Sequence, residues 1–554
     1  MRAARGVGSV ALFTLVTACG GGGGGGGGSM PPPGGPPPFT SVTQARVSQP
    51  STFLGGCDGV AATRRLYTDT AAEPYLVVNP TSPMNLISAW QQNRWSDGGA
   101  QGLNFAASFD GGMTWTPSNA AVSRCTGGNA GNAGNYARAT DVWLTVSPIG
   151  AVYALSLSFT GGALLAGSSS AMLVAQSHDG GQTWGAPIAL IQDGATAFND
   201  KGSITADSTD ANYVYAVWDR LTGQTAGPSY FAVTADAGST WLPARSIYDP
   251  GAQSQTLGNQ IVVLPGDVVL DVFTELGAQS ALVRVMQSSN HGTNWSAPVT
   301  VSDLQAVGTT DPNTHAVVRD GSGLVSVSVG PGGIIYVAWQ DSRFSGGQHD
   351  GIAMTHSADG GLTWSVPVQV NADHSVQAFT PTIHVRADGV IGVTYYDLRN
   401  ATSSPASLLT DCWLVTSSDG VTFRESHLSG PFDLDLAPNS QGLFLGDYQS
   451  LASTASGFLP FYVQTDAGTQ VRSDAFIAFP PATASVQALA GAAGATFQAR
   501  AAPAGMTQTP AARQRVMERL RLTRAQRRHQ PDCGSHSSRG FPSGSCSRAN
   551  RPLG

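Results

Sequence analysis

One short motif recurs along this chain and constrains its fold more than any other feature. It has the form Ser-x-Asp-x-Gly-x-Thr-Trp, with strong copies at residues 108–115 (SFDGGMTW), 177–184 (SHDGGQTW) and 357–364 (SADGGLTW). Weaker copies occupy residues 234–241 (TADAGSTW), 288–295 (SSNHGTNW) and 417–423 (SSDGVTF). Six copies at intervals of 54 to 69 residues indicate a protein built from one repeated structural unit.

This motif is the Asp-box, and its residue types suit a tight hairpin turn. An Asp side chain accepts hydrogen bonds from backbone N–H groups just after it, and glycine adopts positive φ without strain. The aromatic residue then re-enters a strand, where it packs on a neighbouring sheet. The motif therefore predicts structure, and not catalysis by its own residues.

The segments between the boxes repeat a pattern of four short strands, which describes one blade of a β-propeller. The first, innermost strands are expected to begin near Glu73, Asp141, Asp200, Asn259, Arg319, Thr380 and Gly446. We therefore predict an all-β fold: a single β-propeller with Asp-box hairpins and seven blades, with six blades as the alternative. Residues 42–48 are expected to add the fourth strand of the last blade and close the ring.

Four regions are expected along the chain. Residues 1–18 have the positive start and the short apolar run of an export signal, and small residues precede Cys19 as in bacterial lipoprotein signals. An ordinary cleaved signal is the alternative. Residues 19–40 then form a lipidated Cys19 with a Gly/Pro-rich tether, and residues 41–480 form the propeller. Residues 481–554 are expected to be an Ala/Gly/Pro linker and a disordered basic tail, with a basic helix over residues 513–528 as the alternative.

Composition excludes several functions. Lys201 is the only lysine and precedes Gly202, so the chain has no GxxxxGK[ST] phosphate-binding loop. Residues 1–480 hold 18 basic and 34 acidic side chains, a net charge of −16 that does not favour nucleic-acid binding. The ten His residues lack zinc-ligand spacing. Asp433 and Asp435 supply too few of the six to eight oxygens that Ca²⁺ takes, so we expect no cofactor, with weak Ca²⁺ binding as the alternative.

The six cysteines fit an oxidising compartment. Cys57 and Cys125 lie in Gly-rich loops, where a disulfide between them is expected. Cys412 lies in an apolar stretch and is expected to be a buried thiol, whereas Cys533 and Cys546 are expected to pair locally. With the lipoprotein signal, these features predict an exported lipoprotein of the bacterial cell envelope, monomeric and in contact with the membrane only through its lipid.

The Asp-boxes and strand pairs of residues 42–479 resemble the sialidase superfamily of propellers, also called BNR-repeat proteins. Asp-boxes also occur in sortilin-like receptors, xyloglucan hydrolases and assembly factors, so they indicate architecture more firmly than activity. The match is closer to bacterial sialidase-like proteins at four motifs: Glu73-Pro74 with Asn79-Pro80, Asn199-Asp200-Lys201, residues 395–399 (YYDLR) and residues 446–451 (GDYQSL).

The resemblance implies a Tyr nucleophile polarised by a Glu, an acid for the leaving group and an Arg cluster for the substrate carboxylate. On that basis Tyr448 is the candidate nucleophile, Glu275 its partner and Asp97 the acid. The candidate substrate-binding residues are Arg94, Arg319, Arg343, Lys201 and Asp447. Lys201 stands out because a compact ammonium binds differently from the guanidinium that the chain uses everywhere else.

Two functions remain open. The first is an exported sialidase-like glycoside hydrolase of the retaining exo-sialidase type, and the second is a non-catalytic propeller that binds glycan or protein at the cell envelope. Sialidases begin their first inner strand with an Arg, whereas this strand begins Glu73-Pro74-Tyr75, which favours the second function. Tyr448 and Glu275 within hydrogen-bond distance in the central funnel, beside at least two Arg, would favour the first.

Overall fold

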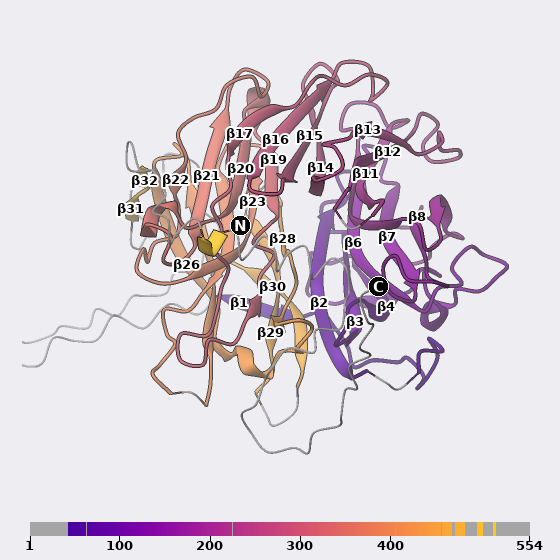
Figure 1. Cartoon of the computed structure of the whole chain (residues 1–554), viewed down its shortest axis with the longest axis horizontal. Coiled ribbons are helices and arrows are strands. Elements are labelled where there is room, and N and C mark those ends of the chain that lie inside the picture. The colour runs from indigo at the N-terminus through magenta and orange to yellow at the C-terminus, as the bar shows by residue number, and fades with distance from the viewer. Residues whose placement is uncertain are drawn as a thin grey trace, which may run out of the picture. The chain divides into compact units, whose positions relative to one another are not determined.

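The computed structural model describes residues 42–61, 64–223, 225–404, 406–455, 457–467, 471–481, 496–501 and 514–516. The expected signal peptide, Cys19, the whole tether, Cys533 and Cys546 lie outside these residues. Strands make up nearly all of the regular structure, in agreement with the all-β prediction (Figure 1). No helix in the described part of the chain has the length and hydropathy needed to cross a membrane.

Successive strands in the described residues pair antiparallel into seven four-stranded units, which we number in chain order. Unit 1 contains β2 (Leu66–Val78), β3 (Leu86–Trp95), β4 (Ala100–Ser108) and β5 (Thr116–Ser118). Unit 2 contains β6 (Arg138–Val146), β7 (Val152–Thr160), β8 (Ser169–Ser177) and β9 (Ile188–Asp193). Unit 3 contains β10 (Phe198–Ala206), β11 (Val214–Leu221), β12 (Ser229–Thr234) and β13 (Arg245–Tyr248). Unit 4 contains β14 (Gln255–Leu264), β15 (Val268–Leu276), β16 (Ala281–Ser288) and β17 (Val299–Asp303).

Units 5 to 7 continue the series. Unit 5 contains β19 (Val325–Val329), β20 (Ile335–Asp341), β21 (Gly351–Ser357) and β22 (Val368–Gln369). Unit 6 contains β23 (Ala378–Val385), β24 (Ile391–Asp397), β25 (Leu409–Ser417) and β26 (Thr422–Asp433). Unit 7 contains β28 (Ser450–Ser453), β29 (Phe458–Thr465), β30 (Ser473–Phe479) and β1 (Thr43–Arg46). The other elements are η1 (Arg124–Thr126), β18 (Val318–Arg319), η2 (Pro331–Gly333), η3 (Arg343–Ser345), η4 (Leu434–Leu436), β27 (Leu443–Phe444), β31 (Thr496–Gln498) and β32 (Arg500–Ala501).

The first strand of each unit lies against the first strand of the next. This order runs from β2 through β6, β10, β14, β19 and β23 to β28, which returns to β2. Side chains bridge the junctions: the Gln260 amide donates to the Val325 carbonyl (2.6 Å), and the Thr382 hydroxyl donates to the Gln449 carbonyl (2.8 Å). β1 pairs antiparallel with β30, so residues near the start of the described chain supply the last unit's fourth strand, as expected.

A residue with positive φ recurs at corresponding places in the first-strand segments. These residues are Glu73 (φ 50°), Asp141 (53°), Lys201 (46°), Gly258 (65°), Gly321 (64°) and Thr380 (51°). At five of the six the register against the second strand shifts, as in a β-bulge. The left-handed conformation costs a non-glycine residue about 1–2 kcal/mol, but it turns a side chain out of the ladder. The bulges thereby bring Glu73, Asp141 and Lys201 together.

The Asp-boxes form the hairpin turns that their sequences predict. Asp110 accepts hydrogen bonds from the N–H of Thr114 (2.9 Å) and from its hydroxyl (2.6 Å), and Ser108 Oγ accepts one from the N–H of Gly112 (2.8 Å). The same contacts recur at Asp179, Asp236 and Asp359. Hydrogen bonds from the Thr114 hydroxyl and N–H hold the pKa of Asp110 well below its usual range. The boxes therefore act structurally.

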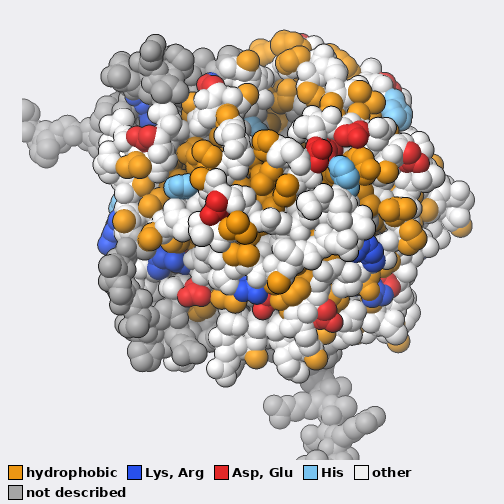
Figure 2. Space-filling model, turned by 90° about the horizontal axis from the view of Figure 1, so that it is seen from above, with side chains coloured by type: hydrophobic (Ala, Val, Ile, Leu, Met, Phe, Trp, Pro, Cys, Tyr) orange, Lys and Arg blue, Asp and Glu red, His pale blue; other side chains and the backbone are white. Residues whose placement is uncertain are grey.

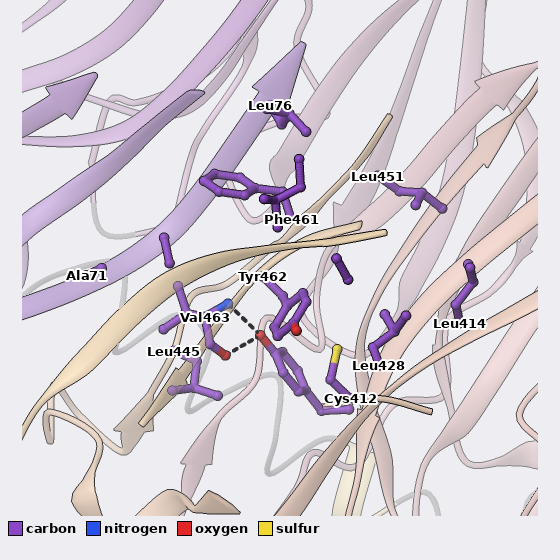
Figure 3. Packing of buried hydrophobic residues seen from close by; sticks show 14 of the residues in the cluster. Ala71, Leu76, Cys412, Leu414, Leu428, Leu445, Leu451, Phe461, Tyr462 and Val463 are labelled. Atoms are coloured by element: carbon purple, nitrogen blue, oxygen red, sulfur yellow. Dashed lines mark hydrogen bonds between the residues drawn. The ribbon is translucent and has the colours of Figure 1, made fainter. Parts of the chain in front are cut away.

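Hydrophobic clusters fill the spaces between neighbouring units. Figure 3 shows the cluster that joins units 1, 6 and 7, where Tyr462 of β29 lies beside the buried free thiol of Cys412 and Phe461 of the same strand lies toward Leu76 of β2. The Tyr396 hydroxyl in this cluster donates to the Val463 carbonyl (2.7 Å) and accepts from the Val463 N–H (3.0 Å). Outside the core, charged side chains are sparse among uncharged ones on the face that Figure 2 presents.

Segments near both ends of the described chain contact the units through a disulfide, through strand pairing and through a buried side chain. Cys57 and Cys125 form a disulfide that links the loop before β2 to η1. Beyond residue 481, β31 pairs with the outer strand β26 of unit 6, and β32 pairs with the outer strand β22 of unit 5. Val516 is also buried, in a cluster of units 4 and 5. The prediction of an unstructured linker and tail is therefore wrong for residues 496–501 and 514–516. These residues pair with exposed sheet edges or pack on the core.

Candidate binding site

A cavity lies where the first-strand segments of the seven units meet. Its volume, including the open mouth, is about 860 Å³. Residues of every unit line it: Tyr75 from unit 1, Trp143 from unit 2, Lys201 from unit 3, Gln260 from unit 4, Ser326 from unit 5, Thr382 and His384 from unit 6, and Asp447, Tyr448 and Gln449 just before β28 of unit 7. A concave site to which all units contribute is where a ligand is expected to bind.

The ammonium group of Lys201 forms one end of this cavity and is surrounded by carboxylates. Its Nζ lies 2.7 Å from Asp447 Oδ2, 2.8 Å from Asp141 Oδ1 and 3.2 Å from Glu73 Oε1. An ammonium has three N–H donors and no acceptor. All three donors are therefore engaged within the protein, by carboxylates from units 1, 2 and 7.

Two arginines complete the charged cluster. Arg319 donates from Nε to Asp447 Oδ1 (2.9 Å) and from Nη2 to Asp447 Oδ2 (2.6 Å), which is the bidentate geometry that guanidinium groups favour. The ring of Phe444 lies against both guanidinium groups, with its centroid 4.3 Å from Arg94 Cζ and 4.5 Å from Arg319 Cζ. Arg94 also donates to Gln91, which in turn donates to Glu73. Both arginines are thus engaged by protein groups.

Burial and charge act on the carboxylates in opposite directions. Burial raises the pKa of Glu73 to about 7, although the positive charge of Lys201 opposes the increase. Burial alone would also raise the pKa of Asp447, but Arg319 and Lys201 hold that pKa well below its usual range. The three acidic side chains are matched by three cations, Lys201, Arg94 and Arg319, so the cluster has little net charge to offer a ligand.

Aromatic rings form the adjoining wall of the cavity. The ring centroids of Tyr75 and Trp143 are 4.3 Å apart, and those of Trp143 and Tyr448 are 5.4 Å apart. Lys201 Nζ lies 5.9 Å from the Tyr448 centroid. All three rings are partly exposed. The rings are tilted to one another, by 40° between Tyr75 and Trp143 and by 60° between Trp143 and Tyr448, and present an apolar surface next to polar groups. Such a surface suits a ligand with both apolar faces and hydroxyl groups.

The wall formed by units 5 and 6 carries uncharged polar groups. Ser326 Oγ accepts a hydrogen bond from the Ile383 N–H (3.1 Å), and its own hydroxyl hydrogen is left to donate. The Nε2 atom of His384 lies 2.9 Å from Ser453 Oγ. Burial, and then the charge of Arg386, lower the pKa of His384 to about 4, so this imidazole is neutral at pH 7.

The structure does not bring Tyr448 and Glu275 together. The Tyr448 hydroxyl donates to the Val142 carbonyl (3.0 Å), whereas Glu275 accepts from the Tyr248 hydroxyl (2.8 Å). Glu275 lies on β15, the second strand of unit 4, and follows Phe273 by two residues. Asp341 follows Trp339 in the same way on the second strand of unit 5, so Glu275 occupies a repeated structural position and not the centre.

Two further expected site residues also lie away from the cluster. Asp97 forms ion pairs with Arg138 (2.8 Å) and Arg64 (3.8 Å) and is not among the residues that line the cavity. Arg343 is bonded to Asp341 (2.8 Å) within unit 5. The expected pairing of Tyr448 with Glu275 and the central position of Arg343 are therefore wrong, whereas the acid role of Asp97 stays a prediction.

The remaining expected residues do meet: Lys201, Arg319, Arg94, Asp447 and Tyr448 lie in or beside the cavity. Glu73, Asp141 and Trp143 were not expected as site residues. Their position in the repeat could have indicated them, because Glu73 and Asp141 occupy the same place in their first strands as Lys201 does in β10.

No group of three or more His, Cys, Asp and Glu side chains among the described residues is arranged to hold a metal ion. Glu73, Asp141 and Asp447 surround the Lys201 ammonium instead. At the weak Ca²⁺ candidate, the Asp433 carboxylate accepts hydrogen bonds from the N–H groups of Leu408 (2.9 Å) and Asp435 (3.1 Å). That carboxylate thus binds its own backbone.

Comparison with solved structures finds distant likenesses. An α-L-arabinanase from Penicillium chrysogenum has 16% identity and a TM-score of 0.41, over 64% of this chain and 94% of that one. A Hadza microbial sialidase has 17% identity and a TM-score of 0.40, over 65% of this chain and 66% of that one. The intramolecular trans-sialidase from Ruminococcus gnavus has 14% identity and a TM-score of 0.39, over 78% of this chain and 97% of that one. No family model and no curated protein matches the chain.

Proposed function

We propose that this chain is a seven-bladed β-propeller whose axial cavity binds an uncharged saccharide without hydrolysing it. The blade count is supported by the seven four-stranded units, and ring closure by the contact of β28 with β2 and by the pairing of β1 with β30. Saccharide binding is supported above all by one combination: an aromatic wall of Tyr75, Trp143 and Tyr448 lies beside a cluster whose charges are paired with one another.

A saccharide fits this lining chemically. The C–H faces of a sugar ring pack on aromatic side chains, and its hydroxyl groups exchange hydrogen bonds with amides and hydroxyls. Trp143 and Tyr448 supply the aromatic surface, and the Ser326 hydroxyl supplies a donor.

The charge distribution favours a neutral sugar over an acidic one. A substrate carboxylate needs a cation with free donors. The three donors of Lys201 are engaged by carboxylates, and Arg319 is engaged bidentately by Asp447. An anionic ligand would have to break a buried ion pair, which is costly when one partner is left unpaired.

The same contacts disfavour hydrolysis by a sialidase mechanism. That mechanism needs a Tyr nucleophile bonded to a Glu and an accessible acid. Tyr448 is bonded instead to a backbone carbonyl, and Glu73 of the central cluster is fully buried. We therefore favour the non-catalytic alternative, with a glycan as the partner and a monomeric propeller.

We also propose that the protein is exported and anchored by a lipid on Cys19. The Cys57–Cys125 disulfide supports this proposal, because such bonds persist in oxidising compartments.

Glycan binding is tested with Trp143→Ala. A glycan array identifies ligands, and titration calorimetry then compares the variants. Trp143→Ala removes the centre of the aromatic wall and should weaken binding by at least about ten-fold, roughly 1.4 kcal/mol. Trp295→Ala, which removes the Asp-box aromatic of unit 4 that packs on Phe231 of unit 3, should leave the affinity unchanged. Equal losses in both variants, or no glycan bound by the wild type, would count against the proposal.

A further inference from the structure

The two ends of the axial cavity are built differently. In each unit the first and third strands run in the same direction, so the first-strand ends and the Asp-box turns lie at the same end. The hydrogen bond from the Gly111 N–H to the Met84 carbonyl (2.9 Å) joins an Asp-box to such a first-strand turn. We call this end the Asp-box end, and the opposite end, where the first strands begin, the far end.

Residues 436–447, which we call the plug, cross the far end. β27 of the plug pairs in parallel with β18, just before unit 5. The Ser440 hydroxyl donates to the Trp95 carbonyl of unit 1 (3.0 Å), and the Asp447 carboxylate accepts from Lys201 of unit 3 (2.7 Å). Units 1, 3 and 5 are not neighbours in the order of first-strand contacts. A segment bonded to all three must therefore span the axis.

Side chains on the plug side of the Lys201 cluster are more buried than those on the cavity side, as expected if the plug closes the far end. On the plug side Ser440 and Phe444 are 0% exposed and Arg94 is 1% exposed. On the cavity side Gln260, Thr382 and His384 are half-buried and line an open mouth. All three follow the bulges in their first strands, so they lie toward the Asp-box end.

We propose that the cavity is a blind pocket: the plug closes its far end, and a ligand enters from the Asp-box end. This inference rests on the proposed function for the nature of the ligand, but its geometry stands apart from it. A blind pocket accepts the end of a chain and not its middle. The terminal, uncharged residue of a glycan would therefore be bound against Tyr448 and the Lys201 cluster, with the rest of the glycan leaving past units 5 and 6.

Thiol labelling tests the direction of access without any glycan. Thr382→Cys places a thiol in the cavity, and Ser440→Cys places one in the plug. The full-length proteins are treated with N-ethylmaleimide, and modified cysteines are identified by peptide mapping. Buried thiols react only through opening of the fold, so the thiol introduced at position 382 should react at least about 100-fold faster than the thiol introduced at position 440. The buried native Cys412 reports on unfolding in every sample.

The results separate the alternatives. Fast labelling at position 440, or labelling at position 382 as slow as that of Cys412, would overturn the blind pocket. If Thr382→Cys unfolds the protein, labelling of Cys412 will rise, and Ser326→Cys, also in the cavity wall, replaces it under the same criteria.

Glycan binding then distinguishes this proposal from the proposed function. Maleimide attached at position 382 should abolish binding of the array-selected glycan, whereas maleimide attached to the thiol of Asn439→Cys, on the exposed surface of the plug, should leave it unchanged. Loss of binding on labelling at position 439 would show access from the far end. Absence of any glycan ligand would remove the proposed function and leave the labelling result intact.

Discussion

Lys201 shows how one residue organises the centre of the molecule. A compact ammonium can donate to three separate carboxylates, whereas a planar guanidinium directs its donors in one plane. The sequence singled out Lys201 as the only lysine, and the structure places it among Glu73, Asp141 and Asp447. Glu73 and Asp141 escaped prediction as its partners because they come from other units, and the left-handed bulges that aim them carry no marker when the residue is not glycine.

Removing the Lys201 charge should destabilise the fold strongly. Lys201→Met leaves buried carboxylates without their cation, and breaking such a buried pair typically costs about 3–5 kcal/mol. Urea denaturation of the full chain measures the loss. Arg284→Met, which breaks a partly exposed ion pair with Glu275, should cost less than about 1 kcal/mol. Similar losses in the two variants would contradict the central role of Lys201.

Glu73 should make stability depend on pH. Burial raises its pKa from 4.5 in the unfolded chain to about 7 in the fold. The folded protein therefore binds more protons than the unfolded chain between these pH values, and this group's contribution to stability falls as the pH rises from 4.5 to 7. Glu73→Gln cannot titrate. The Tm of the wild type minus that of Glu73→Gln should fall across this window, and a constant or rising difference would refute the assignment.

Two of the expected site residues failed for a reason visible in the repeat. Glu275 and Asp341 each stand two residues after an aromatic residue on a second strand, where Glu275 pairs with Arg284 of unit 4 and Asp341 pairs with Arg343 of unit 5. Sequence spacing placed Glu275 on a second strand and Arg343 just after one. It could not show that second strands lie away from the axis at those residues, because only the three-dimensional stacking of the units decides that.

At the scale of elements, the sequence predicted the repeated parts best. The Asp-box turns depend on local hydrogen bonds between residues at most four apart, so their sequence is sufficient to specify them. Five of the seven expected first-strand positions coincide with the bulge of a first strand and not with its first residue, whereas Arg319 and Gly446 precede β19 and β28. Each of the five marked a polar residue at or beside the place where the register shifts.

The added edge strands were not predictable in the same way. β31 and β32 are three and two residues long and pair through backbone groups, which leave no periodic pattern in the side chains. Their Ala/Gly/Pro-rich surroundings indicated a linker. The structure shows instead that this segment covers the outer edges of units 5 and 6.

For the whole molecule, the box repeat predicted an all-β ring, and the four-strand pattern predicted the N-terminal strand that completes unit 7. What the repeat did not reveal is how the centre differs from one unit to the next. The charged residues of units 1, 2, 3 and 7, together with the plug, turn a symmetric axis into a one-ended cavity with an aromatic wall.

The most direct test of the account is a calorimetric comparison of one glycan in two forms, neutral and capped with sialic acid, with the products analysed by mass spectrometry. We predict that the neutral form binds and that the capped form binds at least about ten-fold more weakly, because Lys201, the cation that lines the cavity among the described residues, is already engaged by three carboxylates. We also predict that no sugar is released. Release of sialic acid by the wild type but not by Tyr448→Phe would contradict the account and restore the sialidase mechanism.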